Sequence, residues 1–390
     1  MILPQHVPVP DAAEVQRNQA LERLIRAEIE AAGGAIDFMR FMELTLYAPK
    51  LGYYSSVSQK FGESGDFVTA PEIGPLFARC LARQCRQVLG QLGRGDILEV
   101  GAGSGALAAG LLTALADNGA LPERYCILEL SAELRLRQAE YLAREIPQLA
   151  PLVTWLDHLP EPGLHGVVIA NEVLDAMPVQ RFRWFHDEVR LLHVAWEQGR
   201  FAWRETPAPA AISDLLRARI GTIPLRSGYT SEINQQAEAW VRSLADVLAE
   251  GVILIVDYGF PRAEFYHPDR DTGTVMCHYR HHAHDDPLVL AGLQDITAHV
   301  DFTGIAEAGY DAGLSVQGYT SQAAFLLATG ITENMPATSG EPRAQLRVAQ
   351  EIRKLTLPQE MGELVKVMAL GRGLTEPLLG FAIQDRRARL

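Results

Sequence analysis

Basic residues, paired cysteines and long hydrophobic runs are all scarce in this chain of 390 residues. Lys and Arg number 35 against 48 Asp and Glu, which gives a formal net charge of −13 at pH 7. This balance excludes a general nucleic-acid-binding protein, whose affinity depends on Lys and Arg that neutralise phosphates. An acidic chain is compatible with a basic peptide or protein as substrate.

The four cysteines form no C-x-x-C pair, and Cys126 lies within an apolar segment, so we expect reduced, structural thiols. No apolar run reaches the roughly 18 residues that a membrane-spanning helix requires, so we expect no membrane partner. The first residues show neither the apolar core of a signal peptide nor an Arg-rich transit helix. The sequence as given therefore predicts a cytoplasmic location.

A glycine-rich turn is the most informative feature that the chain does have. Gly101, Gly103 and Gly105 follow a short apolar strand at 97–100 and precede a helical segment at 106–115. Open α/β sheets bind nucleotide-like ligands at such a turn, at the carboxyl end of a parallel strand. The spacing is G-x-G-x-G and differs from the G-x-G-x-x-G of dinucleotide sites.

Acidic residues at three successive strand ends indicate which ligand the turn binds. Glu99 precedes the first glycine by two residues, where it would repel a pyrophosphate but attract the ammonium and sulfonium of S-adenosylmethionine. Glu129 ends the next strand (125–129), where nucleotide folds bind a ribose diol. Asp157 ends a third strand (153–157) and could contact adenine. The pattern predicts S-adenosylmethionine as the cofactor.

The segment after strand four carries the candidate catalytic residues Asn171, Glu172 and Asp175. It lacks the Asn or Asp followed by two prolines and an aromatic that nucleobase-amine methylation typically uses. Glu172 and Asp175 are spaced i, i+3, so they could share one face of a helical turn and orient a planar guanidinium. Alternatively, Asp175 caps a helix and Glu172 alone meets cofactor or solvent. The residues leave both interpretations open.

The organisation that we expect is a nucleotide fold with additions. Residues 1–90 form an N-terminal helical lid region, 91–375 the catalytic domain, with insertions at about 180–230 and 260–301, and 376–390 a C-terminal tail, of which we expect 386–389 to be solvated. Residues 180–204 alternate apolar and polar residues, which predicts antiparallel hairpins inserted in the sheet. We expect further helices at 14–31, 38–46, 76–89, 132–144, 235–249 and 303–312, and strands at 166–170, 252–257, 314–319 and 365–370.

The chain resembles the MidA family, which comprises arginine methyltransferases that act as mitochondrial complex I assembly factors and their bacterial relatives. The resemblance rests on six blocks in order, at 65–73 (GDFVTAPEI), 99–105 (EVGAGSG), 170–179 (ANEVLDAMPV), 257–259 (DYG), 295–302 (DITAHVDF) and 318–322 (GYTSQ). It implies a class I, Rossmann-like α/β fold with a seven-stranded doubly wound sheet. It also implies S-adenosylmethionine as cofactor and, for the mitochondrial members, symmetric dimethylation of an arginine in a complex I subunit.

Carried over to this sequence, the resemblance places candidate cofactor-binding residues at Glu99, Gly101, Ala102, Gly103, Gly105, Glu129, Leu130, Asp157 and Asn171, with Asp66 and Glu72 in a lid loop. Asn171, Glu172 and Asp175 would face the transferred methyl. The substrate expected is an arginine-containing protein, and a homodimer is compatible with the sequence. Two alternatives stay open, a methyltransferase for small molecules and a cofactor-binding assembly chaperone.

A histidine-rich stretch at 277–286 raises the question of a metal site. It contains Cys277, His278, His282 and His284, but neither a neighbouring cysteine nor a paired downstream histidine completes a ligand set. We therefore predict no metal and interpret the stretch as a polar loop that faces the substrate. The alternation of Asp295, Thr297, His299 and Asp301 suggests that they line the site; the alternative is a helix start capped by Asp301 or Thr303.

Overall fold

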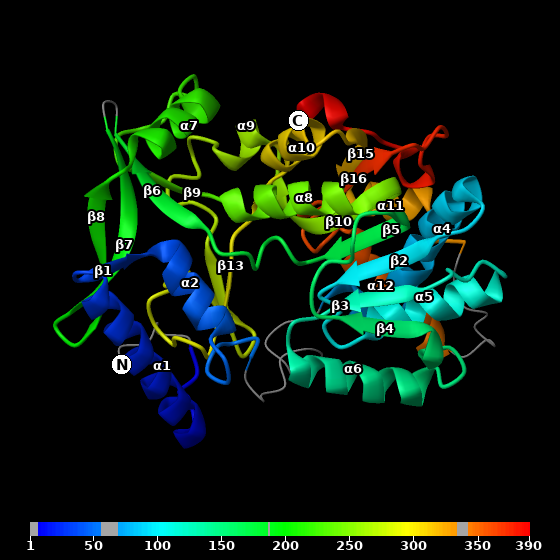
Figure 1. The fold of residues 1–390 in the computed structure, drawn as a ribbon, viewed down its shortest axis with the longest axis horizontal. Coiled ribbons are helices and arrows are strands. Elements are labelled where there is room, and N and C mark those ends of the chain that lie inside the picture. The colour runs from blue at the N-terminus through cyan, green and yellow to red at the C-terminus, as the bar shows by residue number, and fades with distance from the viewer. Residues whose placement is uncertain (1–6, 56–68, 186–187, 334–341) are drawn as a thin grey trace. The chain divides into compact units, whose positions relative to one another are not determined.

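The computed structural model describes residues 7–55, 69–185, 188–333 and 342–390 (Figure 1). The chain divides into two compact units, each assembled from three separated segments. Unit 1 comprises Met1–Phe67, Asp175–Ala237 and Phe260–Asp301, and unit 2 comprises Val68–Leu174, Glu238–Gly259 and Phe302–Leu390. The N-terminal segment and both expected insertions thus contribute to unit 1, and the glycine-rich turn belongs to unit 2.

The sheet of unit 2 is mixed and mostly parallel. Its strands are β2 (Asp96–Val100), β3 (Tyr125–Leu128), β4 (Val153–Leu156), β5 (Leu164–Asn171), β10 (Leu248–Phe260), β15 (Ser315–Ser321) and β16 (Val365–Arg372). They run in the order β15-β16-β10-β5-β2-β3-β4, with β16 antiparallel to both of its neighbours. The short strand β14 (Val300–Asp301) pairs with β10 off this path, so within the described residues the sheet has eight strands, one more than expected. The carboxyl ends of β2, β3, β4, β5 and β10 share one edge.

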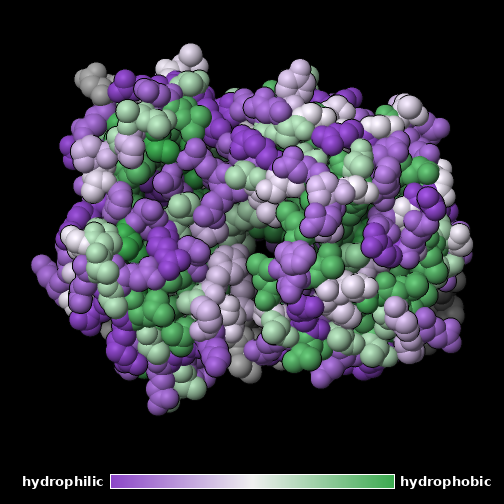
Figure 2. All heavy atoms as spheres, in the orientation of Figure 1, coloured by the Kyte–Doolittle hydropathy of each residue, from purple (hydrophilic) through white to green (hydrophobic). Residues whose placement is uncertain are grey.

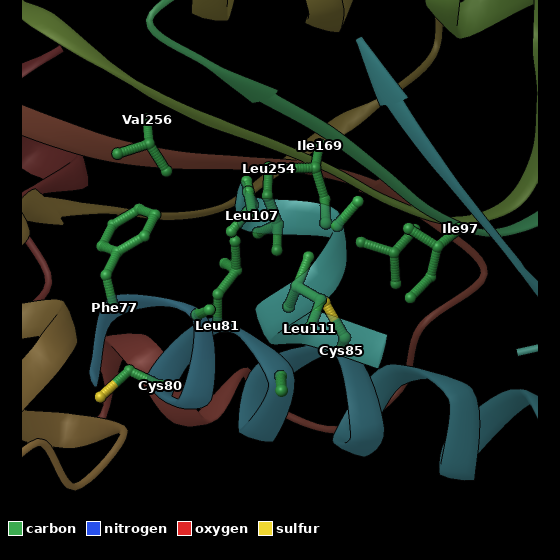
Figure 3. Close-up of a cluster of buried hydrophobic side chains, with 14 of the residues drawn as sticks. Phe77, Cys80, Leu81, Cys85, Ile97, Leu107, Leu111, Ile169, Leu254 and Val256 are labelled. Atoms are coloured by element: carbon green, nitrogen blue, oxygen red, sulfur yellow. The ribbon is translucent and has the colours of Figure 1, made fainter. Parts of the chain in front are cut away.

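Helices bury both faces of this sheet, as expected for a doubly wound fold. Side chains of α4 (Pro75–Leu92) and α5 (Ala106–Asp117) cover one face, as Figure 3 shows with Phe77, Leu81, Cys85, Leu107 and Leu111 near Ile97, Ile169, Leu254 and Val256. The opposite face carries Leu370, against which Gly309 of α10 (Phe302–Asp311) packs so closely that an added Cβ would lie 2.8 Å from it. The predicted α/β fold class is confirmed.

The remaining elements of unit 2 are α3 (Ala70–Ile73), α6 (Ala132–Glu145), α8 (Gln235–Val247, which begins in unit 1), α11 (Gln322–Ala328), α12 (Pro342–Thr356) and three short 3-10 helices at Ala150–Leu152, Leu379–Phe381 and Arg387–Arg389. In the C-terminal segment, residues 387–389 are exposed, as expected, whereas Arg386 is only partly exposed. Arg386 pairs with Glu363, its N–H donates to the Tyr319 carbonyl at 2.6 Å, and Phe381 is buried. This packing holds the C-terminal residues against the β15 side of the sheet.

Gly166 in β5 allows a close approach between the central strands, and replacing it is expected to destabilise the sheet. Its φ is 146°, and a Cβ would lie 1.9 Å from the carbonyl oxygen of Asp96 in β2. Because backbone cannot move aside cheaply, we expect Gly166→Ala to lower the free energy of unfolding by about 3 kcal/mol or more, measured by thermal and urea melts.

Gly163 provides the matched control, since it combines a φ of 126° with no atom within 4 Å of its would-be Cβ. Gly163→Ala therefore measures backbone strain alone, which we expect to cost about 1 kcal/mol. Equal melting temperatures for the two variants would contradict the steric argument.

Unit 1 has a sheet of its own. Strands β1 (Ala35–Asp37), β6 (Gln180–Trp184), β7 (Val189–Glu197), β8 (Arg200–Pro207) and β9 (Tyr229–Ile233) form it, with order β1-β7-β6-β9 and β8 beside β7. The expected hairpins at 180–204 exist, but they are not inserted in the sheet of unit 2. They pair instead with β1 from the N-terminal segment and with β9, so that the apolar side chains of β7 and β8 pack with those of the N-terminal helices.

The other elements of unit 1 are α1 (Ala12–Ala31), α2 (Phe38–Tyr47), α7 (Ala210–Ile220), α9 (Arg262–Phe265), the three-stranded sheet β12-β11-β13 (His282–His284, Met276–Tyr279, Asp295–Thr297) and β14 (Val300–Asp301). A capping box of Asp11 and Glu14 begins α1 and satisfies its first backbone N–H groups. Leu21, Ile25 and Ile29 of this helix are buried against α2 and β7, which makes the N-terminal segment an integral part of the unit's core.

Over the described part of the chain, every helix is too short or too polar to cross a membrane. Hydrophilic and hydrophobic residues are intermixed on the face shown in Figure 2.

Candidate functional site

The glycine-rich turn connects β2 to α5 in a conformation that depends on glycine. Gly101, Gly103 and Gly105 have φ values of 65°, 54° and 87°, a left-handed region that side chains with a Cβ rarely adopt. The Gly101 N–H donates to the Leu128 carbonyl of β3 at 3.0 Å, and Gly105 is the N-cap of α5. The turn therefore places α5's N-terminus at the carboxyl edge of the sheet.

Glu99 lies beneath this turn as a buried carboxyl group, 2% exposed. Its Oε2 accepts a hydrogen bond from the Tyr125 hydroxyl at 2.6 Å. Burial raises the pKa of Glu99 to about 7, and the nearby charge of Glu129 adds to the shift. Among the described residues no cation pairs with Glu99, so a cationic ligand would relieve a charge that the protein itself leaves uncompensated.

Glu99→Gln is expected to stabilise the ligand-free protein at pH 8. The folded-state pKa of about 7 lies above the 4.5 that is usual for a glutamate, so the unfolded chain loses this proton first as pH rises. The buried carboxyl thus costs stability that sets in above pH 4.5 and reaches about 3 kcal/mol above pH 7. Glutamine can still accept from Tyr125 but carries no charge.

Urea melts of wild type and Glu99→Gln at pH 5 and pH 8 measure this gain in stability, which should be small at pH 5. Calorimetry should show weaker binding of S-adenosyl-homocysteine by the same variant, because the charge that attracts its ammonium is gone. A variant less stable than wild type at pH 8 would show that the buried charge is not costly.

Glu129 and the glycine turn are joined by Gln138 of α6. Glu129 is 8% exposed; its Oε1 accepts from the Ser131 N–H at 2.9 Å and its Oε2 from the Gln138 amide at 3.1 Å. The same amide donates to the Gly103 carbonyl at 3.0 Å, and its oxygen accepts from the Trp155 indole at 2.9 Å. Burial raises the pKa of Glu129. Glu129 and the glycine turn, both candidates for binding the cofactor, are therefore held in one hydrogen-bond network.

The carboxyl end of β5 presents Asn171 and Glu172. Glu172 Oε1 accepts from the Ala70 N–H at 3.4 Å and from the Asn171 amide at 3.3 Å. Burial, followed by the charge of Asp257, raises the pKa of Glu172 to about 8. The amide oxygen of Asn171 is buried and accepts no hydrogen bond from the described residues. This edge therefore offers an acceptor and an acid to a ligand.

The expectation that Glu172 and Asp175 share a face of a helical turn is wrong. Glu172 has a left-handed φ of 53°, and residues 172–179 form bends and turns. The fully buried Asp257 of β10 explains this, since its Oδ2 accepts from the N–H groups of Val173 and Leu174 at 3.1 and 2.8 Å. These bonds fix the backbone at Val173 and Leu174, and no helix forms over residues 172–179. Asp175 begins the next segment, in unit 1.

The remaining candidate cofactor-binding residues differ in exposure and in location. Ala102 is buried in the turn, Leu130 is 80% exposed beside Glu129, and Glu72 lies in α3. The side chain of Asp157 is 74% exposed just beyond β4, 3.6 Å from His158. Asp66 lies outside the described residues. Contact with cofactor stays a prediction for all of these.

In unit 1, the polar residues of 295–301 have separate roles. Asp295 accepts from the Tyr54 hydroxyl at 2.9 Å, and Asp301 pairs with Arg262 at 3.2 Å. His278, His282 and His284 lie on the β11–β12 hairpin. No group of three or more His, Cys, Asp or Glu within the described ranges is arranged to hold a metal ion.

Gln138, Trp155 and Tyr125 are polar residues of the site that were not predicted from the sequence, and Asp257 was known only as part of the DYG block, without a role. Gln138 did carry a signal, because it lies on the buried stripe of α6 between Leu134 and Leu142. A glutamine at such a position must find partners within the fold.

The residues of unit 2 fit S-adenosylmethionine. Glu99 is a buried acid with a raised pKa that suits a cationic ligand, the Asn171 oxygen is an unused acceptor, and the glycine turn carries no Cβ at its three glycines. Glu129 is held in a fixed orientation at the end of the adjacent strand, where a ribose diol is bound in nucleotide folds.

Comparisons with known proteins agree with this chemistry. A family model for S-adenosyl-L-methionine-dependent methyltransferases matches residues 80–320. The mouse mitochondrial protein arginine methyltransferase NDUFAF7 is 27% identical over 372 residues, which cover 86% of this chain and 81% of the mouse protein. The Drosophila melanogaster homologue is 27% identical over 428 residues, which cover 97% and 92%.

Two crystal structures from Burkholderia thailandensis are similar throughout. One, of a methyltransferase-like protein bound to S-adenosyl-homocysteine, is 47% identical, covers 98% of this chain and 100% of that chain, and gives a TM-score of 0.94. The other, a native structure, is also 47% identical with the same coverage and a TM-score of 0.92. With the turn, the acids and these matches in agreement, the chain belongs to the S-adenosylmethionine-dependent methyltransferases, in the family of MidA and NDUFAF7.

Proposed function

We propose that this protein is a protein arginine N-methyltransferase. The observation that carries the proposal is the carboxyl group of Glu172. Both of its hydrogen bonds from the described residues reach Oε1, so Oε2 is available to a substrate N–H. A carboxylate suits a guanidinium, whose planar N–H groups point to paired oxygens. The mouse and Drosophila relatives are named protein arginine methyltransferases, which supports the same acceptor.

The residues at this edge would position rather than activate the substrate. S-adenosylmethionine supplies a methyl group on a positively charged sulfur, so transfer of this methyl group requires only a correctly aligned nucleophile. Glu172 would accept from the guanidinium and localise its charge, which leaves another nitrogen better able to attack. Ala70 and Asn171 hold the Glu172 carboxyl in place through Oε1. The guanidinium starts protonated, so as the C–N bond forms and the methyl's bond to sulfur breaks, a proton would leave the attacking nitrogen for solvent.

The substrate that we propose is an arginine-containing protein. More specifically, we propose symmetric dimethylation of an arginine in a respiratory complex I subunit. Its support is the resemblance to the mitochondrial proteins. The acidic net charge of −13 is compatible with a basic protein segment as partner. A small-molecule acceptor and a chaperone role are the outcomes that the experiments below distinguish from it.

The decisive experiment is transfer of radiolabelled methyl from S-adenosylmethionine into extract proteins of a strain that lacks this gene. We expect a labelled protein band with wild type and none with Glu172→Gln. Acid hydrolysis of the band should yield methylarginine. Robust turnover without methylarginine would overturn the arginine assignment and favour a small-molecule acceptor.

Complementation separates catalysis from a chaperone role. If methyl transfer is the function, Glu172→Gln should fail to restore respiratory assembly in the deletion strain. Full rescue by this variant, with methylation absent, would favour a binding role instead.

A further inference from the structure

Gln138 is completely buried on α6 and satisfies three groups from three other elements. Its amide nitrogen donates to Glu129 Oε2 at 3.1 Å and to the Gly103 carbonyl at 3.0 Å, and its amide oxygen accepts from Trp155 Nε1 at 2.9 Å. These partners belong to the end of β3, to the glycine turn and to β4. One side chain therefore ties together the turn and the acid that follows the next strand.

Trp155 fixes which way the Gln138 amide points. An indole N–H can only donate, so the amide oxygen must face it. The two amide hydrogens are then directed at the Glu129 carboxylate and the Gly103 carbonyl, both of which can only accept. Reversing the amide would place its oxygen against two acceptors and its NH₂ against a donor. The orientation is thus determined by the hydrogen-bond network.

This arrangement leaves the Glu129 carboxylate, which the Leu130 N–H also stabilises, able to accept from a ligand. Ser131 N–H occupies one position on Oε1 and Gln138 one on Oε2, while a carboxylate offers about four positions in all. The two carboxylate oxygens are spaced to accept from the two hydroxyls of a vicinal diol. Without Gln138, the carboxylate could rotate and the Gly103 carbonyl would lack this donor.

We propose that Gln138 is a positioning residue that orients Glu129 toward the ribose diol of the cofactor and fixes the glycine turn at Gly103. The proposal rests on the assignment of Glu129 to the ribose, which is part of the proposed cofactor site. A merely structural glutamine would affect folding but would not couple to the charge of Glu129. The test therefore reads out that coupling through pH.

Gln138→Glu is the informative variant, measured as the dissociation constant of S-adenosyl-homocysteine by calorimetry between pH 6 and pH 9. The new carboxyl would lie about 3 Å from Glu129, and two carboxyls so close share one proton at lower pH. In that state the protonated group still donates to Glu129, so binding should be close to that of wild type. At higher pH the pair becomes doubly charged, and the ratio of variant to wild-type dissociation constants should rise by at least about tenfold.

Two further variants test the proposal even if the Gln138→Glu protein folds poorly. Gln138→Leu should weaken binding by about tenfold at every pH, because the donor is lost without a new charge. Trp155→Phe removes the N–H that fixes the amide, and its effect on binding should disappear in the Gln138→Leu background. Gln148→Glu makes the same charge change at an exposed site beyond α6 and should bind as wild type does.

The outcomes distinguish a failure of the proposed role of Gln138 from a failure of the assignment of Glu129 to the ribose. If Glu129→Ala binds S-adenosyl-homocysteine as tightly as wild type, the ribose assignment fails. If Glu129→Ala binds weakly while the Gln138→Glu ratio is independent of pH and the Trp155 effect persists without Gln138, the positioning role of Gln138 is overturned. A ratio that rises with pH, together with a vanishing Trp155 effect, supports it.

Discussion

The Gly103→Val variant should bind S-adenosyl-homocysteine at least about 100-fold more weakly than wild type, with the protein still folded. Gly103 has a φ of 54°, a region that a β-branched residue essentially does not adopt, so the turn must rearrange. Its carbonyl also accepts from Gln138, and a rearranged turn would lose this contact to the cofactor network. Calorimetry gives the affinity, and circular dichroism confirms the fold.

Gly119→Val is the matched control for that experiment. Gly119 has a similar φ of 63°, and no atom lies within 4 Å of a Cβ placed there. It should suffer comparable backbone strain without loss of binding. Tight binding by Gly103→Val, or equal losses in both variants, would show that the turn does not shape the cofactor site.

Glu172→Gln is expected to lower kcat by about 100-fold or more while changing the affinity for S-adenosyl-homocysteine by no more than about threefold. Glutamine can still accept from Ala70 and Asn171 through its oxygen, so the local structure should persist. The charge that would localise the guanidinium is lost. Steady-state kinetics on the labelled acceptor, with calorimetry alongside, measure the two effects separately.

The pH dependence of kcat/KM of the wild-type protein should report the titration of the same group, Glu172. The pKa of Glu172 is raised to about 8 in the ligand-free protein, so the carboxyl is mostly protonated at pH 7. Since the carboxylate is the form that attracts a guanidinium, kcat/KM should rise about tenfold per pH unit below pH 8 and level off above it. The Glu172→Gln variant should lack this rise.

Asp96→Asn is a suitable control for the loss of a buried carboxylate. Asp96 is 7% exposed and begins β2, at the amino edge of the sheet, where it pairs with Arg124. We expect its kcat/KM and pH profile to match those of wild type after correction for folded protein. A pH rise that persists in Glu172→Gln would assign the titration to another group.

The sheet of unit 2 could be predicted because its strands are continuous apolar runs bounded by turn residues. Strand β10 was expected at 252–257 and observed at Leu248–Phe260, and β2, β5 and β16 agree to within a few residues. These strands are buried on both faces, so burial and sequence agree locally. The glycine turn was equally accessible, since its conformation depends on residues adjacent in the chain.

The assembly of unit 1 could not be predicted in the same way. Strand β1 has three residues and pairs with β7, some 160 positions later in the chain, as Ala35 with Ala195. Nothing in a three-residue strand indicates such a partner. The helices α7, α11 and α12 were also missed, and α12 has two buried residues, Glu351 and Leu355, on a largely polar sequence. Long-range packing decides these elements.

The site was predicted only in part, for a related reason. Glycines and strand-end acids are visible in the sequence, but the turn that follows the left-handed Glu172 is held by Asp257, 85 positions away from Glu172. The same holds for Gln138, whose role depends on Trp155 and Gly103 as much as on Glu129. Orientation within the site is a property of contacts between elements.

The position of β16 has a consequence for the order in which the protein can form during synthesis. This strand begins at residue 365, yet it is inserted between β15 and β10 within the sheet. Until it leaves the ribosome, β10 exposes an apolar edge that invites aggregation. Unit 1, by contrast, has all its segments once residue 301 has been made. We therefore expect unit 1 to fold first, and truncations before β16 to yield insoluble protein.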